Sequence, residues 1–179
     1  MLAAAMSAEP DRVIAAVRAN SADLLAFLAR RVDPAEDAAD LLSEVLVVVW
    51  RRSPTLPVDD AEVRPWMFGI ARKMLARHYR TTSRRHAVAD RLRSVLSTTE
   101  HAGFAAADAR LDLRAAVREL GAVDRDIIGL VHWEGFSLAE TSRILRMKEA
   151  TVRSRYHRAR AKLRQVLTDT DPAVVERMG

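Results

Sequence analysis

The amino-acid sequence predicts an all-α protein made of two small helical domains joined by a flexible linker, the C-terminal one a helix-turn-helix DNA-binding domain. Three observations lead to this prediction. Apolar residues recur at helical spacing over most of the chain. A polar, Ala-rich stretch over residues 81–108 separates two such regions. Near the C-terminus a short capped helix, a tight turn and a basic helix follow one another, which is the helix-turn-helix order.

The first region is predicted to contain three helices. The first spans about 21–32, before the Asp33-Pro34 break, and the second spans about 35–52. The run Val45–Val49 could form a buried strand, but it continues a helical pattern with no turn signal before it, so we predict helix. A loop with two prolines follows over 53–63. A third helix starts near Arg64-Pro65, with proline in its first turn, and ends near residue 80.

The domain limits follow from these elements. We predict a first domain over residues 1–86, a linker over 87–109, a second domain over 110–168 and a tail over 169–179. The helical pattern of the linker is weak, which is compatible with a linker that is helical in part. The final helical unit is predicted to begin near Leu111.

The stretch from Arg146 to Arg164 is the most informative part of the chain. It holds eight basic residues and one acidic residue, Glu149. Apolar residues at helical spacing line one face: Val152, Tyr156, Ala159, Leu163 and Val166. Basic residues line another: Arg153, His157, Arg160 and Arg164. Such a helix suits docking on a core while presenting charge to a polyanion.

The residues before this helix make the interpretation more specific. Ser137 and Glu140 form a capping-box pattern that starts a short helix ending near Leu145, and a turn of three or four residues follows. A basic helix is often only a solvated surface helix. Here the cap, the turn length and the lack of balancing acids favour DNA binding.

A second cationic segment lies at the end of the third helix. Residues 72–85 contain six basic residues and no acid, which predicts a second contact with nucleic acid. His78 or Tyr79 could stack on a base, although Tyr79 could equally belong to the core.

The overall composition excludes several other classes. The 179 residues carry 29 basic and 24 acidic side chains, for a net charge of +5, and no cysteine. Disulfides and Cys-based metal sites are therefore excluded. The five histidines lack metal-ligand spacing and there is no glycine-rich phosphate loop. We expect no enzyme activity, no catalytic residue, no metal and no cofactor. No secretion signal or membrane-length apolar run is visible, so a cytoplasmic protein is expected.

Taken together, these motifs resemble a sigma factor of the extracytoplasmic-function (ECF) type, in the sigma-70 family of RNA polymerase sigma subunits. The resemblance covers about residues 20–86 and 110–167. It is carried by Asp40–Leu46 with Trp50-Arg51, by Arg64–Arg72, by Leu113–Leu120, and by Trp133–Ser137 with Thr151–Arg155. It implies a protein that binds core RNA polymerase and directs promoter-specific transcription initiation, with promoter DNA and an anti-sigma factor as further partners.

The resemblance also implies roles for individual residues. Polymerase binding falls on Asp40, Ser43 and Glu44. Recognition of the minus-ten element falls on Lys73, Arg77, Arg80, Arg84 and Arg85, with Asp59 in the loop that captures a flipped base. Recognition of the minus-thirty-five element falls on Thr151, Arg153, Ser154, Arg155, His157 and Arg158. Within that set, Arg155 and Arg158 are expected at phosphates and the base-reading positions are Arg153, Ser154 and His157.

Several residues depart from the family pattern. Lys73 and Arg77 replace a usual Asn and Asp, so the family's minus-ten preference cannot be transferred. Arg146 stands where Gly usually makes the turn, which predicts either a left-handed arginine, at a cost of about 1–2 kcal/mol, or a turn of different shape. Thr141 replaces a core Ile, which is tolerable if its methyl packs inward and its hydroxyl finds a carbonyl.

Two rival functions remain at this point. One is an autonomous helix-turn-helix regulator that binds operators as a dimer. The other is a sigma mimic that sequesters an anti-sigma factor, although a mimic should lack the dense arginine surface seen here.

Overall fold

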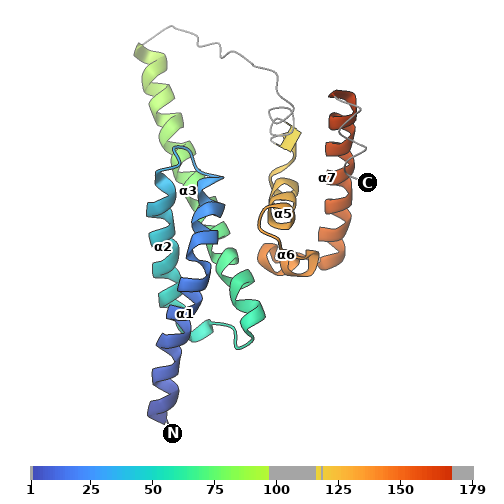
Figure 1. The fold of residues 1–179 in the computed structure, drawn as a ribbon. Coiled ribbons are helices and arrows are strands. Elements are labelled where there is room, and N and C mark those ends of the chain that lie inside the picture. The colour runs from blue at the N-terminus through green and yellow to red at the C-terminus, as the bar shows by residue number, and fades with distance from the viewer. Residues whose placement is uncertain (1, 97–115, 118, 171–179) are drawn as a thin grey trace. The chain divides into compact units, whose positions relative to one another are not determined.

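The computed structural model describes the backbone of residues 2–96, 116–117 and 119–170, and the side chains of residues 10–82, 116–117 and 119–165. Every regular element in these ranges is helical, which confirms the all-α prediction. The chain divides into two compact units, Met1–Thr99 and Glu100–Gly179, whose helices are labelled in Figure 1. The predicted domain limits at residues 86, 110 and 168 stay predictions.

The described part of the first unit packs three helices against one another: α1 (Leu2–Ala29), α2 (Asp37–Arg51) and α3 (Asp60–Leu96). A short 3-10 turn, η1 (Ser53–Thr55), follows α2. The rings of Phe27 and Phe68 meet edge to face, with centroids 5.3 Å apart, and join α1 to α3. The run Val45–Val49 is helical, as predicted. The largest fully buried side chains of this unit are Val13, Leu24, Phe27, Leu28, Val45, Val49, Met67 and Phe68.

The predicted start of the first helix near residue 21 is wrong, because α1 begins at Leu2. Asn20 Nδ2 donates to the carbonyl of Ala16, and Ser21 Oγ donates to the carbonyl of Val17. Each side chain therefore bonds back to the turn before it and does not cap a new helix.

The third helix also begins earlier than predicted, at Asp60 instead of Arg64. Asp59 Oδ1 accepts a hydrogen bond from the backbone N–H of Ala61 at 2.9 Å, which is the N-cap arrangement. Pro65 consequently lies inside the helix, where its ring removes one backbone donor.

The end of α3 differs as well. The helix was predicted to end near residue 80 but continues to Leu96, so the first part of the expected linker is helical. Residues 70–96 contain no Gly or Pro and are rich in Ala, Leu and Arg, which favours continuation of the helix. Residues 97–109, the rest of the predicted linker, lie outside the described residues, as does the predicted start of the final helical unit at Leu111.

The second unit contains α5 (Ala122–His132), α6 (Leu138–Leu145) and α7 (Glu149–Thr170). α7 contacts both α5 and α6. The predicted capping box is confirmed: Glu140 N–H donates to Ser137 Oγ at 3.2 Å, and Ser137 N–H donates to Glu140 Oε2 at 2.8 Å. One core cluster joins the segment before α5 to α5 and α7, and consists of Ala116, Val117, Leu120, Ile128, Ala159 and Leu163.

The turn between α6 and α7 takes the left-handed form that was one of the two predicted alternatives. Arg146 has φ 54° and ψ 46°. Its N–H donates to the carbonyl of Arg143 at 3.2 Å, and the N–H of Met147 donates to the carbonyl of Ser142 at 2.9 Å. These two bonds form a Schellman motif, which normally favours glycine at the left-handed position.

The hydroxyl of the buried Thr141 is not satisfied in this structure by a carbonyl of the described residues. Its side chain is fully buried in α6, but Oγ1 has no hydrogen-bond partner among the described residues. Of the two conditions for tolerating this replacement, the one that requires the hydroxyl to find a carbonyl is not met among the described residues. A buried hydroxyl without a partner lowers stability.

Candidate nucleic-acid and polymerase interfaces

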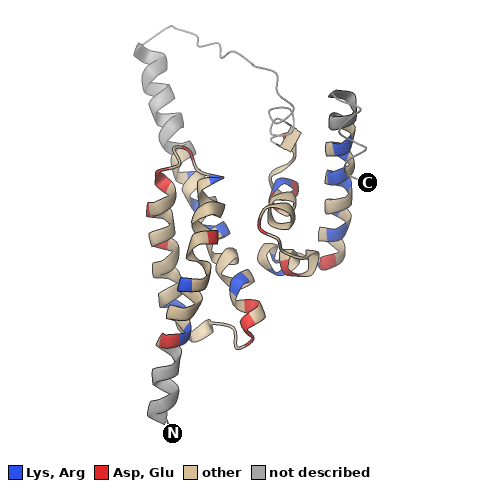
Figure 2. Ribbon diagram, viewed as in Figure 1, with Lys and Arg blue, Asp and Glu red and all other residues tan. Residues whose placement is uncertain are grey.

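The orientation of α7 separates a buried face from an exposed one. Val152, Ala159 and Leu163 are buried, and Tyr156 packs beside them, as the helical spacing predicted. Val166 lies outside the residues whose side chains are described. Five of the six predicted minus-thirty-five residues are exposed on the other side: Thr151, Arg153, Ser154, His157 and Arg158. Figure 2 shows Lys and Arg recurring along this helix.

Arg155, the sixth of these residues, is placed differently. Its Nε donates to Asp124 Oδ1 at 2.7 Å, and about a third of each side chain is exposed. Asp124 lies in the first turn of α5, so this half-buried pair ties the helix α7 to α5. Arg125 of α5 makes a separate connection to the segment before α5, because its guanidinium donates to the carbonyl oxygens of Val117 and Leu120.

Arg153 has an acidic neighbour that sequence reasoning did not consider. Its Nη2 lies 2.6 Å from Glu149 Oε1, one helical turn earlier. Both side chains are largely exposed, so the pair contributes little to stability. A phosphate or a guanine edge can replace Glu149 as the partner of Arg153 at small cost.

A further cluster on α7 was missed from the sequence. His132 stacks on Tyr156 with centroids 5.8 Å apart, and Tyr156 Oη lies 3.2 Å from His132 Nε2. The guanidinium carbon of Arg160 lies over the Tyr156 ring, 5.8 Å from its centroid. Burial, and secondarily the charge of Arg160, lowers the pKa of His132 below its ordinary value. No sequence signal joins residues 24 positions apart in this way.

In the first unit, α2 exposes the three predicted polymerase-binding residues together. Asp40, Ser43 and Glu44 all lie on the solvent side of α2. The hydroxyl of Ser43 donates to the carbonyl of Ala39 at 3.0 Å, so it is turned toward its own helix. Figure 2 shows the acidic residues in the N-terminal half of α2.

The same face of α2 continues into an apolar groove that sequence reasoning missed. Val47 and Trp50 are 49% and 53% exposed, which is unusual for large apolar side chains next to a core. With α1 they line a groove of about 470 Å³, bounded by Ile14, Val17, Arg18, Leu46, Val47, Trp50 and Arg51. Residues 40, 43, 47 and 50 are spaced three or four apart, as on one face of a helix. This spacing was the sequence signal that could have shown that the apolar residues share a face with Asp40 and Ser43.

The cationic end of α3 is only partly described. Lys73, Arg77 and Arg80 are exposed, at spacings of four and three residues along the helix. Arg84 and Arg85 belong to the same helix, but their side chains lie outside the described set. Tyr79 is half-exposed, and its hydroxyl donates to the carbonyl of Arg31, so it joins α3 to the turn that follows α1.

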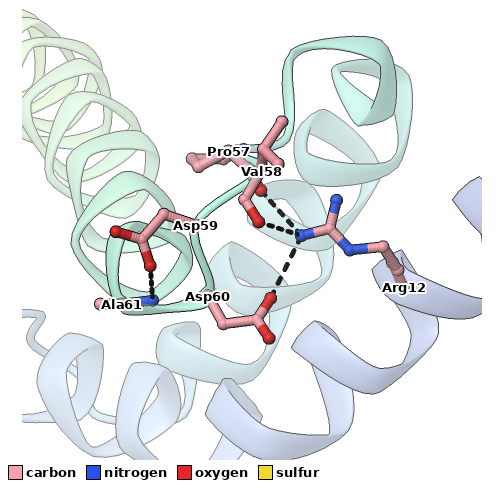
Figure 3. Close-up of polar contacts among 6 residues, drawn as sticks. All are labelled: Arg12, Pro57, Val58, Asp59, Asp60 and Ala61. Atoms are coloured by element: carbon pink, nitrogen blue, oxygen red, sulfur yellow. Dashed lines mark hydrogen bonds and ion pairs between the residues drawn. The ribbon is translucent and has the colours of Figure 1, made fainter.

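The turn that carries Asp59 is fixed from two sides. Asp59 caps α3, as described above, while Arg12 of α1 reaches across to the backbone of Pro57 and Val58 and to Asp60 (Figure 3). Arg12 was not singled out from the sequence, because nothing near it signals contact with residues so distant.

Among the described residues, no group of acidic and histidine side chains is arranged to hold a metal ion. No helix in the described part is long and apolar enough to cross a membrane.

Comparison with known families gives two matches in chain order. Residues 16–85 match Sigma-70 region 2, and residues 110–163 match Sigma-70 region 4. A curated relative is the ECF RNA polymerase sigma factor SigL of Mycobacterium tuberculosis, 28% identical over 175 residues, covering 92% of this chain and 94% of SigL. Another is the RNA polymerase sigma factor SigZ of Bacillus subtilis, 26% identical over 144 residues, covering 80% of each chain.

Solved structures share the fold. The sigma factor RpoE from Bartonella quintana, in complex with the anti-sigma factor NepR, has a TM-score of 0.64 at 24% identity, covering 85% of this chain and 94% of that one. CnrH in complex with the cytosolic domain of CnrY has a TM-score of 0.61 at 24% identity, covering 94% and 95%.

Proposed function

The chain belongs to the ECF group of the sigma-70 family, and from this premise we propose how its surfaces divide the work of initiation. As a sigma factor it binds core RNA polymerase and directs promoter-specific transcription initiation. The proposal concerns which described residues serve each step.

The exposed face of α7 reads the minus-thirty-five element in this proposal. The supporting observation is that burial of Val152, Ala159 and Leu163 turns Arg153, Ser154 and His157 to solvent on the opposite side. A helix presented in this way can enter the major groove, where arginine binds guanine through two hydrogen bonds. Thr151 and Arg158 would then meet phosphates.

Arg155 takes a different part from the one expected from the resemblance. Its contact with Asp124 holds α7 against α5, so its main contribution is to the angle at which α7 is presented. A phosphate contact through its remaining nitrogens is compatible with that bond, because a guanidinium has five N–H donors.

The exposed face of α2 binds core polymerase. Asp40 and Glu44 supply negative charge, and Val47 and Trp50 supply apolar area beside them. Exposed aromatic residues next to a groove are typical anchors of protein interfaces. The groove lined with Trp50 thus extends the surface that Asp40, Ser43 and Glu44 begin.

The minus-ten element is assigned to α3 and the turn before it. Lys73, Arg77 and Arg80 form a cationic stripe that suits the backbone of a single strand, and Arg84 and Arg85 lengthen it. Asp59 lies in the turn, where its carboxylate caps α3. Its contribution is therefore to the shape of the turn.

An anti-sigma factor is the further partner we propose, because the RpoE and CnrH structures each contain a partner chain. We also propose that the protein acts in the cytoplasm and performs no covalent chemistry. Both sigma domains then contribute DNA contacts that are individually weak but become effective when polymerase tethers them to one promoter.

Transcription with purified chain and core RNA polymerase tests the function. We expect transcripts that begin at defined promoters and depend on the added chain. DNase footprinting without polymerase is the companion measurement, in which we expect no protected palindrome. A protected palindrome without polymerase would support an autonomous regulator, and the absence of any chain-dependent transcript would contradict the proposal.

A further inference from the structure

Arg153, a base-reading position proposed for α7, is held by an acidic side chain one helical turn before it. Its Nη2 donates to Glu149 Oε1 at 2.6 Å, and the two side chains are 60% and 45% exposed. The backbone of this turn is fixed, because the carbonyl of Lys148 accepts the N–H groups of Thr151 at 3.0 Å and Val152 at 3.1 Å. Glu149 therefore stands beside the guanidinium at the N-terminal end of α7, the end that recognition helices direct to base edges.

Glu149 is the single acidic residue between Arg146 and Arg164, a stretch with eight basic residues. Figure 2 shows an acidic residue at the beginning of α7 and Lys and Arg farther along it. An acid on a surface that meets DNA lowers the affinity, because it repels the phosphates. Arg158, which is proposed to meet a phosphate, has the uncharged Ser154 one turn before it. The acid is thus placed next to the arginine proposed to read a base.

The Glu149 carboxylate changes which partner the Arg153 guanidinium favours. The pair opens easily, as its exposure indicates, but the negative charge stays close to Arg153 when it does. A phosphate that approaches Arg153 meets this charge, whereas the O6 and N7 edge of guanine carries no net charge. A guanidinium has five N–H donors, so Glu149 can keep one of them while two others bind a base.

We propose that Glu149 is a positioning residue for minus-thirty-five recognition: it directs the Arg153 guanidinium to a base edge and keeps it from the phosphates. This inference rests on the proposed reading of the minus-thirty-five element by α7. An acid in the first turn of a helix also stabilises the helix itself. A purely structural acid of that kind would act through α7 as a whole, and its effect would not depend on Arg153.

The test measures promoter binding by the full chain in complex with core RNA polymerase. Affinity is compared between the best minus-thirty-five element and versions with one base pair changed, and Arg153→Ala identifies the base pair that Arg153 reads. Glu149→Gln should lower discrimination at that base pair about fivefold, the low end of the value of one base contact. Its affinity for DNA without a promoter should rise, with a salt dependence steeper by up to about one phosphate contact. In the Arg153→Ala background, Glu149→Gln should leave discrimination unchanged.

Glu119→Gln is the matched control. Glu119 is an exposed carboxylate of the same unit, in the segment before α5, so its loss changes the net charge by the same amount. This variant should keep the wild-type discrimination. Undiminished discrimination in Glu149→Gln, an equal loss at every base pair or in Glu119→Gln, or a loss that persists without Arg153 would overturn the inference. A wild-type complex that binds all versions of the minus-thirty-five element alike would instead contradict the proposed function of α7.

Discussion

The exposed face of α2 in the first unit and that of α7 in the second have opposite chemistry. α2 presents acidic residues, Asp40 and Glu44, beside the apolar Val47 and Trp50. α7 presents Arg153, Arg158 and other cations, with its apolar residues buried. A surface of the first kind suits a protein partner and one of the second kind suits DNA. Because the two surfaces differ in chemistry and lie on different helices, single substitutions should separate polymerase binding from DNA binding.

The largest effect is expected for Trp50→Asp. A half-exposed aromatic anchor at an interface commonly contributes about 2 kcal/mol or more, so affinity for core polymerase should fall roughly 30-fold or more. Titration of labelled chain with core polymerase measures this. Asp40→Arg should weaken binding less. Wild-type affinity in Trp50→Asp would remove the groove from the interface.

Arg153→Ala should affect the other surface. Loss of one base contact costs about 1–3 kcal/mol, so promoter-specific transcription should fall by roughly 5-fold to 150-fold while core binding is unchanged. Lys162→Ala removes a charge from an exposed position on the same helix and should have a much smaller effect. Equal loss of transcription and core binding in Arg153→Ala would contradict the separation of the two surfaces.

Thr141→Val should change the stability of the second unit without altering its exposed surface, because the Thr141 side chain is fully buried. Removing a buried hydroxyl that has no partner should raise the free energy of unfolding by about 1–2 kcal/mol. Hydrogen exchange of the amides in α5–α7 is the measurement. Thr141→Ser keeps the hydroxyl and removes the methyl, so it should lower stability instead.

Arg155→Ala tests whether this arginine acts through the packing of α7. The half-buried bond to Asp124 should contribute about 1 kcal/mol, after allowance for its partial exposure. Chemical denaturation measures the lost stability, and hydrogen exchange of the α7 amides in the native protein locates it. Arg158→Ala, at an exposed position, should leave stability unchanged. Equal stability of both variants would favour a direct DNA role for Arg155.

The smallest effect is expected for Arg146→Gly. Glycine adopts the left-handed conformation without strain, but it gains entropy in the unfolded chain, so the net gain should be about 0.5–1 kcal/mol. Thermal unfolding measures it. Arg146→Ala removes the long side chain but keeps the strain and should bring no gain, which distinguishes backbone strain from loss of a charge.

Much of the second unit could be predicted from sequence because its determinants are local. The capping box joins Ser137 to Glu140 within one turn, and the left-handed Arg146 is one of the two alternatives that the sequence left open for this turn. The buried face of α7 follows from spacing alone. Trp50 contributes to the family resemblance and shares helical spacing with Asp40 and Ser43, but the apolar groove beside it was not predicted.

By itself, the sequence determined the helical class, the order of the helix-turn-helix elements and the face that α7 exposes. Periodicity and capping act over one or two turns, so they can be recognised in the chain. Only the tertiary structure decided that Arg12 holds a turn 45 residues away and that Arg155 bonds Asp124 across 31 residues. Such pairs depend on how helices pack against one another, and no local pattern specifies which side chains that packing brings together.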